Sequence, residues 1–316
     1  MTAPLVSIVL PTFNRLQLLR LTLDSVAAQT LRDYELLIAD DGSDEPMLAW
    51  LRTLAARPEV RLLELPHSGV LATVRNAALA VARGEYLAFL DSDDLWAPDK
   101  LELQLRQLRS GAPGEWSYTA FTCIDADGVR LPGDAQRKWQ PHSGHVLRQA
   151  ITGELSIRPT TVVARRDLVA RAGGFDPEVC VCSDNNLWIR LAGLSPIQVV
   201  DVPLVAIRTH SQNMSANWPL AYAERDLSLR KLQGHFDAAT CRLLRHERVS
   251  NCLAFAREHA LRTGFAATVR AWWSGARHSW NHAHWWSGGA RVMARALLGR
   301  PRPSSVSSNA AARTTT

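Results

Sequence analysis

The chain has 316 residues, 47% of them hydrophobic, and a formal net charge of +6. This length allows one large domain or two ordinary ones, and this composition excludes an intrinsically disordered chain. The cysteines number five and form no CxxC pair, so a disulfide-built scaffold is not expected and a reducing compartment fits better.

The first hundred residues alternate between two patterns. The apolar runs at 5–10, 34–39, 60–65 and 85–90 are short and continuous, which is typical of strands buried on both faces. Between them, apolar residues recur every three or four positions and predict helices. The first run is too short for a signal sequence or a membrane span, so it is predicted to be a strand, and no transmembrane helix is expected.

The later part of the chain is less regular. Strands are predicted at 116–124 and 197–208, with a loop-rich segment at 132–160 between them, and the pattern from about 219 onward is helical. We therefore expect an α/β fold in which helices flank a mainly parallel sheet, followed by a helical C-terminal extension. The domain limits predicted from this pattern are 1–215 for the α/β domain, 216–300 for the extension, and 301–316 for a disordered tail.

Acidic residues gather directly after two predicted strands. The segment DSDD places Asp91, Asp93 and Asp94 after the strand at 85–90, and ADDGSDE places Asp40 and Asp41 after the strand at 34–39. Ligands of parallel sheets bind beyond the carboxyl ends of the strands. The DSDD carboxylates are therefore either ligands of Mg²⁺ or Mn²⁺ or a solvated turn that caps the following helix. In ADDGSDE, a carboxylate either accepts from a base or ribose, or the segment is a turn in which Ser43 or Asp44 caps the next helix.

Other polar and aromatic residues fall at the same edge. Phe13 and Asn14 follow the first strand, and an aromatic ring there either stacks on a nucleobase or belongs to the core. Arg75 lies on a predicted helix beside the sheet, where it either binds a diphosphate or pairs with a nearby carboxylate.

None of these stretches alone indicates a protein family, but together, in this order, they do. SIVLPTFNR, LLIADDGSDE, HSGVLATVRNAAL and GEYLAFLDSDDLW closely resemble the family 2 glycosyltransferases, and the similarity continues through RRDLVARAGGFDPE, CSDNNLWIRLA and VPLVAIRTHSQNMS. It covers roughly residues 5–215. The resemblance implies an A-type, Rossmann-like nucleotide-diphospho-sugar transferase fold and an inverting, metal-dependent hexosyltransferase.

The resemblance also implies roles for individual residues. Phe13 and Asp41 would contact the base, Arg75 would support the base or the phosphates, and Asp93 would be the principal metal ligand. The metal would be Mn²⁺ or Mg²⁺, with Asp91 contacting it or the ribose and His210 facing the metal and the diphosphate. The full donor site implied in this way consists of Pro11, Phe13, Asn14, Asp40, Asp41, Arg75, Asp91 and Ser92.

The catalytic base implied by the resemblance is Asp184. Family members usually carry an acidic pair before the helix that begins with LW, but here Ser183 precedes Asp184 and a later acidic position is Asn186. Without these neighbouring charges, we expect the Asp184 carboxylate to be less basic than in relatives with an intact pair. The alternative is that Asp184 only caps the helix.

These observations predict two alternative functions, one as an enzyme and one as a binding protein. The first is an inverting glycosyltransferase that moves a sugar from a nucleotide-diphospho-sugar to a hydroxyl of a glycan or lipid-linked acceptor, in the biosynthesis of a glycan or cell-surface polysaccharide. The second is an inactive or weakly active relative that binds a nucleotide-sugar or glycan, which Ser183 and Asn186 keep open.

The C-terminal part is rich in tryptophan and arginine. Five tryptophans lie within 271–300, and eight arginines but no acidic residue follow Glu258. Residues 265–300 either lie on an anionic membrane surface, pack on the catalytic domain, or form an oligomer interface. The first alternative predicts a cytoplasmic protein that is peripheral on the inner face of the membrane, and no nucleic-acid partner is expected.

Overall fold

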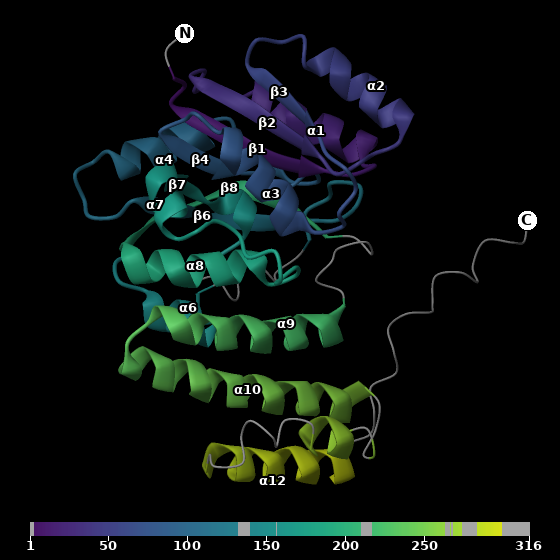
Figure 1. Ribbon diagram of the computed structural model, residues 1–316, viewed down its shortest axis with the longest axis vertical. Helices are drawn as coiled ribbons and strands as arrows, with labels where there is room; N and C mark the ends of the chain where they lie inside the picture. The colour runs from purple at the N-terminus through teal and green to yellow at the C-terminus, as the bar shows by residue number, and fades with distance from the viewer. Residues whose placement is uncertain are drawn as a thin grey trace, which may run out of the picture. The chain divides into compact units, whose positions relative to one another are not determined.

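The computed structural model describes residues 3–131, 140–155, 157–209, 217–262, 266, 268–273 and 283–298 (Figure 1). The chain divides into two compact units, Met1–Ala216 and Asn217–Thr316. Whether the first unit is the catalytic domain and the second an extension stays a prediction. The tail predicted to be disordered, 301–316, lies outside the described residues.

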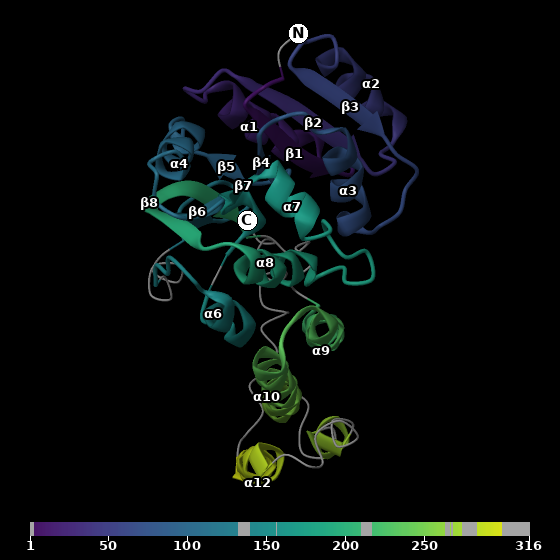
Figure 2. The same ribbon diagram turned by 60° about the vertical axis from the view of Figure 1, so that its left-hand side comes forward.

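An eight-stranded sheet forms the centre of the first unit, in the order β3-β2-β1-β4-β7-β6-β8-β5 (Figure 2). The strands at 5–10, 34–39, 60–65 and 85–90 were predicted correctly, because continuous apolar runs leave no polar face for a helix. The strand bounds are β1 (Val6–Thr12), β2 (Tyr34–Asp40), β3 (Val60–Glu64), β4 (Tyr86–Phe89), β5 (Leu95–Trp96), β6 (Trp116–Ile124), β7 (Val163–Arg165) and β8 (Ile197–Arg208).

The sheet is mixed, which qualifies the expectation of a mainly parallel one. β3, β2, β1 and β4 pair in parallel, and so do β6 and β8. β7 is antiparallel to both β4 and β6, and β5 is antiparallel to β8. The α/β class itself is confirmed.

Helices cover both faces of this sheet. α1, α2 and α4 supply Leu19, Leu51 and Leu101 to a core that includes Ile8 of β1 and Ile38 of β2. On the opposite face lie α3, α7 and α8 (Figure 2). The helix bounds are α1 (Leu16–Ala27), α2 (Glu45–Leu54), α3 (Leu71–Val81), α4 (Lys100–Leu108), α6 (Leu147–Thr152), α7 (Arg166–Arg171) and α8 (Ser183–Leu194), with a short 3-10 helix, η1 (Pro159–Thr161).

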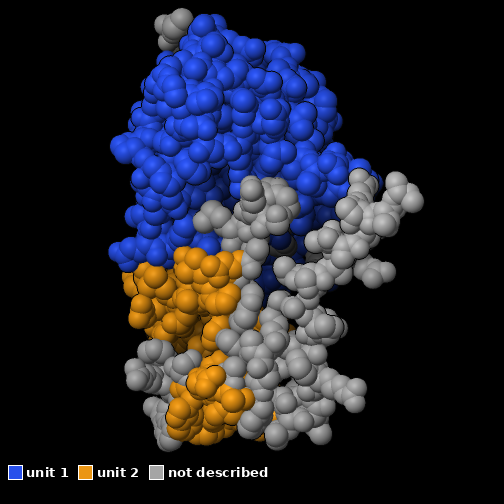
Figure 3. Space-filling view, turned by 90° about the vertical axis from the view of Figure 1, so that its right-hand side faces the viewer, with its two compact units in different colours: residues 1–216 blue, residues 217–316 orange. Residues whose placement is uncertain are grey.

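The second unit, orange in Figure 3, is helical in its described part, as expected. It contains α9 (Trp218–Lys231), the 3-10 helix η3 (Leu232–His235), α10 (Ala238–Arg262) and α12 (Ala283–Leu298), and α10 contacts both α9 and α12. None of the helices that the structure describes is long and apolar enough to cross a membrane.

Tryptophan side chains form a cluster within this second unit. The ring of Trp272 stacks on Trp273 and on Trp285, with centroid distances of 5.3 Å in both cases, and meets Trp286 edge-on at 5.8 Å. Trp285 is fully buried, whereas Trp273 and Trp286 are 56% and 42% exposed. The tryptophans therefore serve as core and as surface of the second unit at once, and the three alternatives for residues 265–300 stay predictions.

Candidate active site

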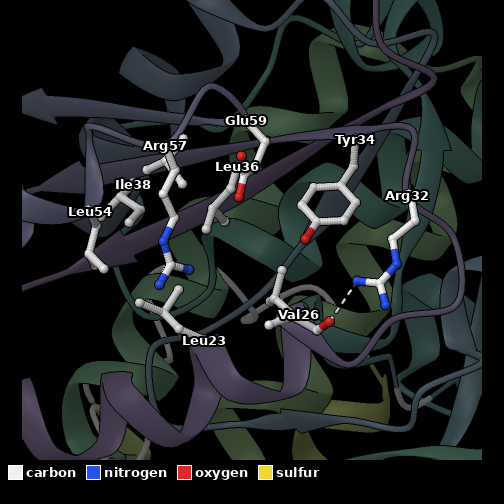
Figure 4. Close-up of a pocket in the computed structure, with 11 residues that line it drawn as sticks. Leu23, Val26, Arg32, Tyr34, Leu36, Ile38, Leu54, Arg57 and Glu59 are labelled. Atoms are coloured by element: carbon white, nitrogen blue, oxygen red, sulfur yellow. Dashed lines mark hydrogen bonds between the residues drawn. The ribbon is translucent and has the colours of Figure 1, made fainter.

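Two cavities at opposite ends of the sheet are considered as candidates for the active site. A cavity of about 130 Å³ lies at the amino-terminal ends of β2 and β3, and Figure 4 shows Leu23, Tyr34 and Arg57 around it. A cavity of about 620 Å³ lies where β1, β2 and β4 end. Ligand sites of small molecules usually measure about 300–1,000 Å³, so the larger cavity is the candidate active site.

Residues from widely separated segments line the larger cavity. Eight of the residues predicted from the sequence are among them, and Asn14 and Asp40 are not. His210 lies outside the described residues. The predicted residues that line it are Pro11, Phe13, Asp41, Arg75, Asp91, Ser92, Asp93 and Asp184.

Asn14 and Asp40 shape the loops behind the cavity. Asn14 has a positive φ of 47°. Its amide N–H donates to Ser43 Oγ at 2.9 Å and its Oδ1 accepts from Asp44 N at 2.9 Å. Asp40 is fully buried, and its carboxylate accepts hydrogen bonds from Gly42 N, Ser43 N and Ser43 Oγ. These contacts tie the loop after β1 to the loop after β2, which is a structural use of both side chains.

Asp41 and Phe13 form one side of the cavity. The Asp41 carboxylate accepts from Ser68 N at 2.8 Å and Gly69 N at 2.9 Å, which fixes the loop after β3. The same loop carries His67, whose ring stacks on Phe13 with centroids 4.4 Å apart. Phe13 is 40% exposed and therefore is not core. A planar nucleobase can stack on an aromatic surface of this kind.

Each aspartate of the Asp-x-Asp pair holds an arginine. Arg75 Nη2 donates to Asp91 Oδ1 at 2.6 Å, and Arg15 Nη1 donates to Asp93 Oδ2 at 2.5 Å. Arg75 is almost fully buried, and its guanidinium lies over the Phe175 ring, 5.2 Å from the ring centroid. Arg75 therefore pairs with a carboxylate, as one alternative predicted, and it also lines the cavity, while diphosphate binding stays a prediction.

The third aspartate of DSDD has a different, structural position. Asp94 is buried, and its carboxylate accepts from Thr160 Oγ1 at 2.6 Å and from Arg208 N at 2.9 Å. Burial, with Asp91 and Asp93 nearby, raises the pKa of Asp94 well above its ordinary value. None of the three aspartates caps α4, whose N-cap is Asp99 without a side-chain cap. The capping alternative for DSDD is therefore wrong.

Asp184 lies in the first turn of α8 and opens onto the cavity. The N-cap of α8 is Cys182, so Asp184 does not cap this helix. Burial raises the pKa of Asp184, while the positive charges of Arg75 and Arg158 and a hydrogen bond from Asn185 N oppose that rise. The sequence argument weighed only neighbouring carboxylates and left out burial, which is the largest influence.

The two departures from the family pattern have structural partners. Ser183 Oγ donates to Cys180 O at 3.1 Å, which closes the turn before α8. Asn186 is buried and its Oδ1 accepts from Arg190 Nε at 3.0 Å. Arg190 in turn donates to the carbonyls of Ala172 and Gly174. Asn186 thus supports the turn after α7 and is not among the residues that line the cavity.

Sequence reasoning missed several cavity residues, among them Arg15, His67 and Arg158. Arg15 and His67 come shortly after the ends of strands. The rule that ligands bind beyond the carboxyl ends of strands, which selected Asn14 and Asp41, was therefore sufficient to select Arg15 and His67 too. Arg158 belongs to an irregular segment before η1, where no periodicity indicates which way a side chain points.

The donor set of the cavity suits a hard cation that is bound together with phosphates. In the described part of the chain, no group of three or more His, Cys, Asp or Glu side chains is arranged to hold a metal. Asp91 and Asp93 provide carboxylate oxygens on one loop of the cavity. Mg²⁺ is commonly held by one or two carboxylates plus substrate phosphates and water, so these residues fit Mg²⁺ or Mn²⁺.

The fold is that of the A-type nucleotide-diphospho-sugar transferases. The crystal structure of S. aureus TarS 1-349 in complex with UDP-GlcNAc matches with a TM-score of 0.70 and 17% identity, over 92% of this chain and 88% of that chain. A mannosyltransferase from Pyrobaculum calidifontis, in complex with GDP-Man and Mn²⁺, matches with a TM-score of 0.55 and 20% identity, over 94% of this chain and 87% of that chain.

Sequence comparison finds related proteins. Residues 7–114 match the model of glycosyl transferase family 2. The chondroitin synthase of Pasteurella multocida (strain Pm70) is 36% identical over 190 residues, which are 60% of this chain and 19% of the synthase. The chain therefore spans about a fifth of the length of that relative.

Proposed function

We propose that the protein is an inverting glycosyltransferase that moves a hexose from a nucleotide-diphospho-sugar to an acceptor hydroxyl in glycan or cell-surface polysaccharide biosynthesis. The observation that carries the proposal is the lining of the 620 Å³ cavity. It combines a stacked aromatic pair, the Asp-x-Asp carboxylates with the two arginines that pair with them, and Asp184, which come from five separate segments of the sequence.

The chemistry assigned to the residues is a single in-line displacement. Asp184 takes the proton of the acceptor hydroxyl as that oxygen attacks the anomeric carbon, and its raised pKa improves it as a base. Arg75 and Arg15 supply positive charge toward the departing diphosphate. Phe13 and His67 orient the base by stacking. One carboxylate is sufficient, because no covalent intermediate forms.

A divalent cation is part of the proposal. Asp91 and Asp93 would hold Mn²⁺ or Mg²⁺, which neutralises charge on the diphosphate leaving group when it is bound. The Mn²⁺ in the P. calidifontis mannosyltransferase supports this cofactor. The assignment of His210 as a further ligand stays a prediction from the resemblance.

The second unit supports a membrane-associated acceptor. Trp273 and Trp286 are exposed, and so are Arg270 and Arg291 of the same unit. Tryptophan and arginine favour the headgroup region of an anionic bilayer. We therefore propose a cytoplasmic protein that contacts the inner face of the membrane through this surface and receives a lipid-linked acceptor there.

The competing proposal is a binding protein that holds a nucleotide-sugar without turnover. Ser183 and Asn186, which replace acidic residues of the family pattern, favour it. The lining position of Asp184 and its raised pKa favour the enzyme instead.

Release of nucleoside diphosphate separates the two proposals. Thermal shifts with a panel of UDP- and GDP-sugars, with and without Mn²⁺, first select a donor, because a ligand of the folded state raises the melting temperature. That donor is then incubated with Mn²⁺ and candidate acceptors. Turnover in the wild type that is lost in Asp184→Asn supports the enzyme. Binding without any release of diphosphate, across all acceptors and in the donor's own hydrolysis, supports the binding protein.

A further inference from the structure

The pair formed by Arg15 and Asp93 places a guanidinium on a proposed metal ligand. Arg15 Nη1 lies 2.5 Å from Asp93 Oδ2, and the side chains of Arg15 and Asp93 are 27% and 12% exposed, respectively. Among the described residues, Asp93 is the side-chain partner of Arg15, and Arg15 lines the same cavity. A cation that binds Asp93 must therefore either displace Arg15 or share the Asp93 carboxylate with it.

The two arginines that pair with Asp91 and Asp93 are held very differently. Arg75 is 3% exposed, lies in the middle of α3 and is fixed over the Phe175 ring. Arg15 is the N-cap residue of α1, with its side chain partly exposed and without a capping hydrogen bond. Arg15 is the arginine that can change partner without moving a helix.

The loop that carries Asp93 is fixed from behind. The backbone carbonyl of Asp93 accepts from Arg208 Nε at 3.0 Å, and the next residue, Asp94, is held by Thr160 and Arg208 N. Arg208 and Asp94 are both buried. A change of partner at Asp93 therefore involves the Arg15 side chain and leaves this loop in place.

We propose that Arg15 exchanges partners when the donor binds. It moves from the Asp93 carboxylate to a phosphate oxygen of the nucleoside diphosphate, and the divalent cation takes its place on Asp93. A guanidinium forms strong charge-assisted hydrogen bonds with either anion, and a hard cation favours carboxylate and phosphate oxygens. Every charge keeps a partner through the exchange. This inference rests on the proposed function.

The exchange couples two binding events. Before the donor arrives, the cation competes with Arg15 for Asp93 and binds weakly. Once a diphosphate holds Arg15, the guanidinium no longer competes for Asp93 and the cation binds more tightly. Because coupling between two ligands is reciprocal, the cation must tighten diphosphate binding by the same factor, and such factors are typically about 5- to 150-fold.

The test measures binding and needs no turnover. Electron paramagnetic resonance of unbound Mn²⁺ gives the Mn²⁺ affinity with and without UDP or GDP, and calorimetry gives the nucleotide affinity in EDTA and in Mn²⁺. In Arg15→Gln we expect tighter Mn²⁺ binding without nucleotide, weaker nucleotide binding, and a coupling factor smaller than that of the wild type. Arg57→Gln is the matched control, since it removes an exposed arginine of the same unit at the smaller cavity (Figure 4) and should leave all values unchanged.

A reciprocal variant keeps the test decisive if Arg15→Gln does not fold. In Asp93→Asn, Arg15 is already released, so nucleotide binding in EDTA should be tighter than in the wild type and should no longer respond to Mn²⁺. If nucleotide binds to the wild type but Arg15→Gln does not tighten Mn²⁺ binding, or Asp93→Asn does not tighten nucleotide binding in EDTA, the exchange is wrong and the proposed function stands. If neither nucleotide binds to the wild type under any condition, both fail.

Discussion

Asp184 is the residue on which turnover depends in the proposed mechanism. In Asp184→Asn, the amide cannot accept the proton of the acceptor hydroxyl, so we expect the chemical step to fall by about 10²- to 10⁴-fold. Donor affinity should change little. Single-turnover kinetics with calorimetry of the donor measures both. A large loss of donor affinity with an intact chemical step would make Asp184 a donor-binding residue instead.

The raised pKa of Asp184 predicts the direction of the pH dependence. A general base must be deprotonated, so kcat/KM should rise with pH through the pKa of the free enzyme, and burial places that pKa above the ordinary value of 3.8. Arg75 lowers the pKa of Asp184 by its charge. In Arg75→Gln, the rising limb of the pH profile should therefore shift to higher pH, which is a shift that loss of donor contacts alone does not produce.

Lys100 is a buried cation in α4 without a hydrogen-bond partner for its Nζ among the described residues. Its Nζ lies 4.2 Å from the centroid of the Trp96 ring. Burial lowers the pKa of Lys100 well below 10.5, so unfolding takes up a proton between the two pKa values. Stability contributed through this group therefore rises with pH in that window.

Lys100→Met should stabilise the first unit. Burying a polar group without a partner costs about 1–3 kcal/mol, and methionine of similar length removes this cost. We expect a melting temperature higher by several degrees at neutral pH, and a gain that shrinks as the pH approaches 10.5. Thermal unfolding by circular dichroism measures it. A variant less stable than the wild type would show that the contact with Trp96 outweighs the burial of the amine.

At the scale of elements, the turn between α7 and α8 is clamped by Asn76 of α3. Asn76 Nδ2 donates to Phe175 O at 2.8 Å, and its Oδ1 accepts from Phe175 N at 2.9 Å. The clamp holds the Phe175 ring beneath Arg75. Gly174 precedes it with a φ of 68°, and a Cβ there would lie 2.9 Å from Asn76 Oδ1.

Gly174→Ala should therefore lower both stability and donor affinity. Gly111 gives a matched control, because its φ of 84° imposes a similar backbone cost but no atom lies within 4 Å of an added Cβ. We expect about 1–2 kcal/mol for the left-handed backbone in both variants, and a further loss in Gly174→Ala alone. Urea unfolding of both variants checks this. Equal losses would mean that the Asn76 clamp adapts without cost.

The elements that sequence predicted well are those with a strong local signal. Continuous apolar runs marked the strands around Ile8 and Ile38, and the carboxyl-edge rule led to Asp41 and Asp91. The antiparallel position of β7 was not predictable, because strand pairing is decided by contacts between distant segments. The pairing of Arg15 with Asp93, which are 78 residues apart, is hidden from sequence patterns for the same reason.

At the scale of the whole molecule, we expect reversible binding to anionic membranes. Each cationic residue near such a surface contributes about 1 kcal/mol, and the exposed tryptophans add interfacial burial. The full chain should sediment with phosphatidylglycerol vesicles at low salt and less at high salt, and Trp273→Ser/Trp286→Ser should weaken this. Leu194→Ser is the control, since Leu194 is an exposed apolar residue of the first unit. A full chain that stays in the supernatant at low salt would exclude the membrane contact.

The tryptophan cluster also has an optical consequence. Indoles whose rings lie 5.3–5.8 Å apart exchange excitation energy efficiently, so light absorbed by the buried Trp285 reaches the exposed Trp286 through Trp272. The Trp272 and Trp286 rings are inclined by 72°, so each such transfer rotates the plane of emission. Emission from this cluster should therefore be depolarised and sensitive to quenchers in the solvent, although one of its rings is fully enclosed.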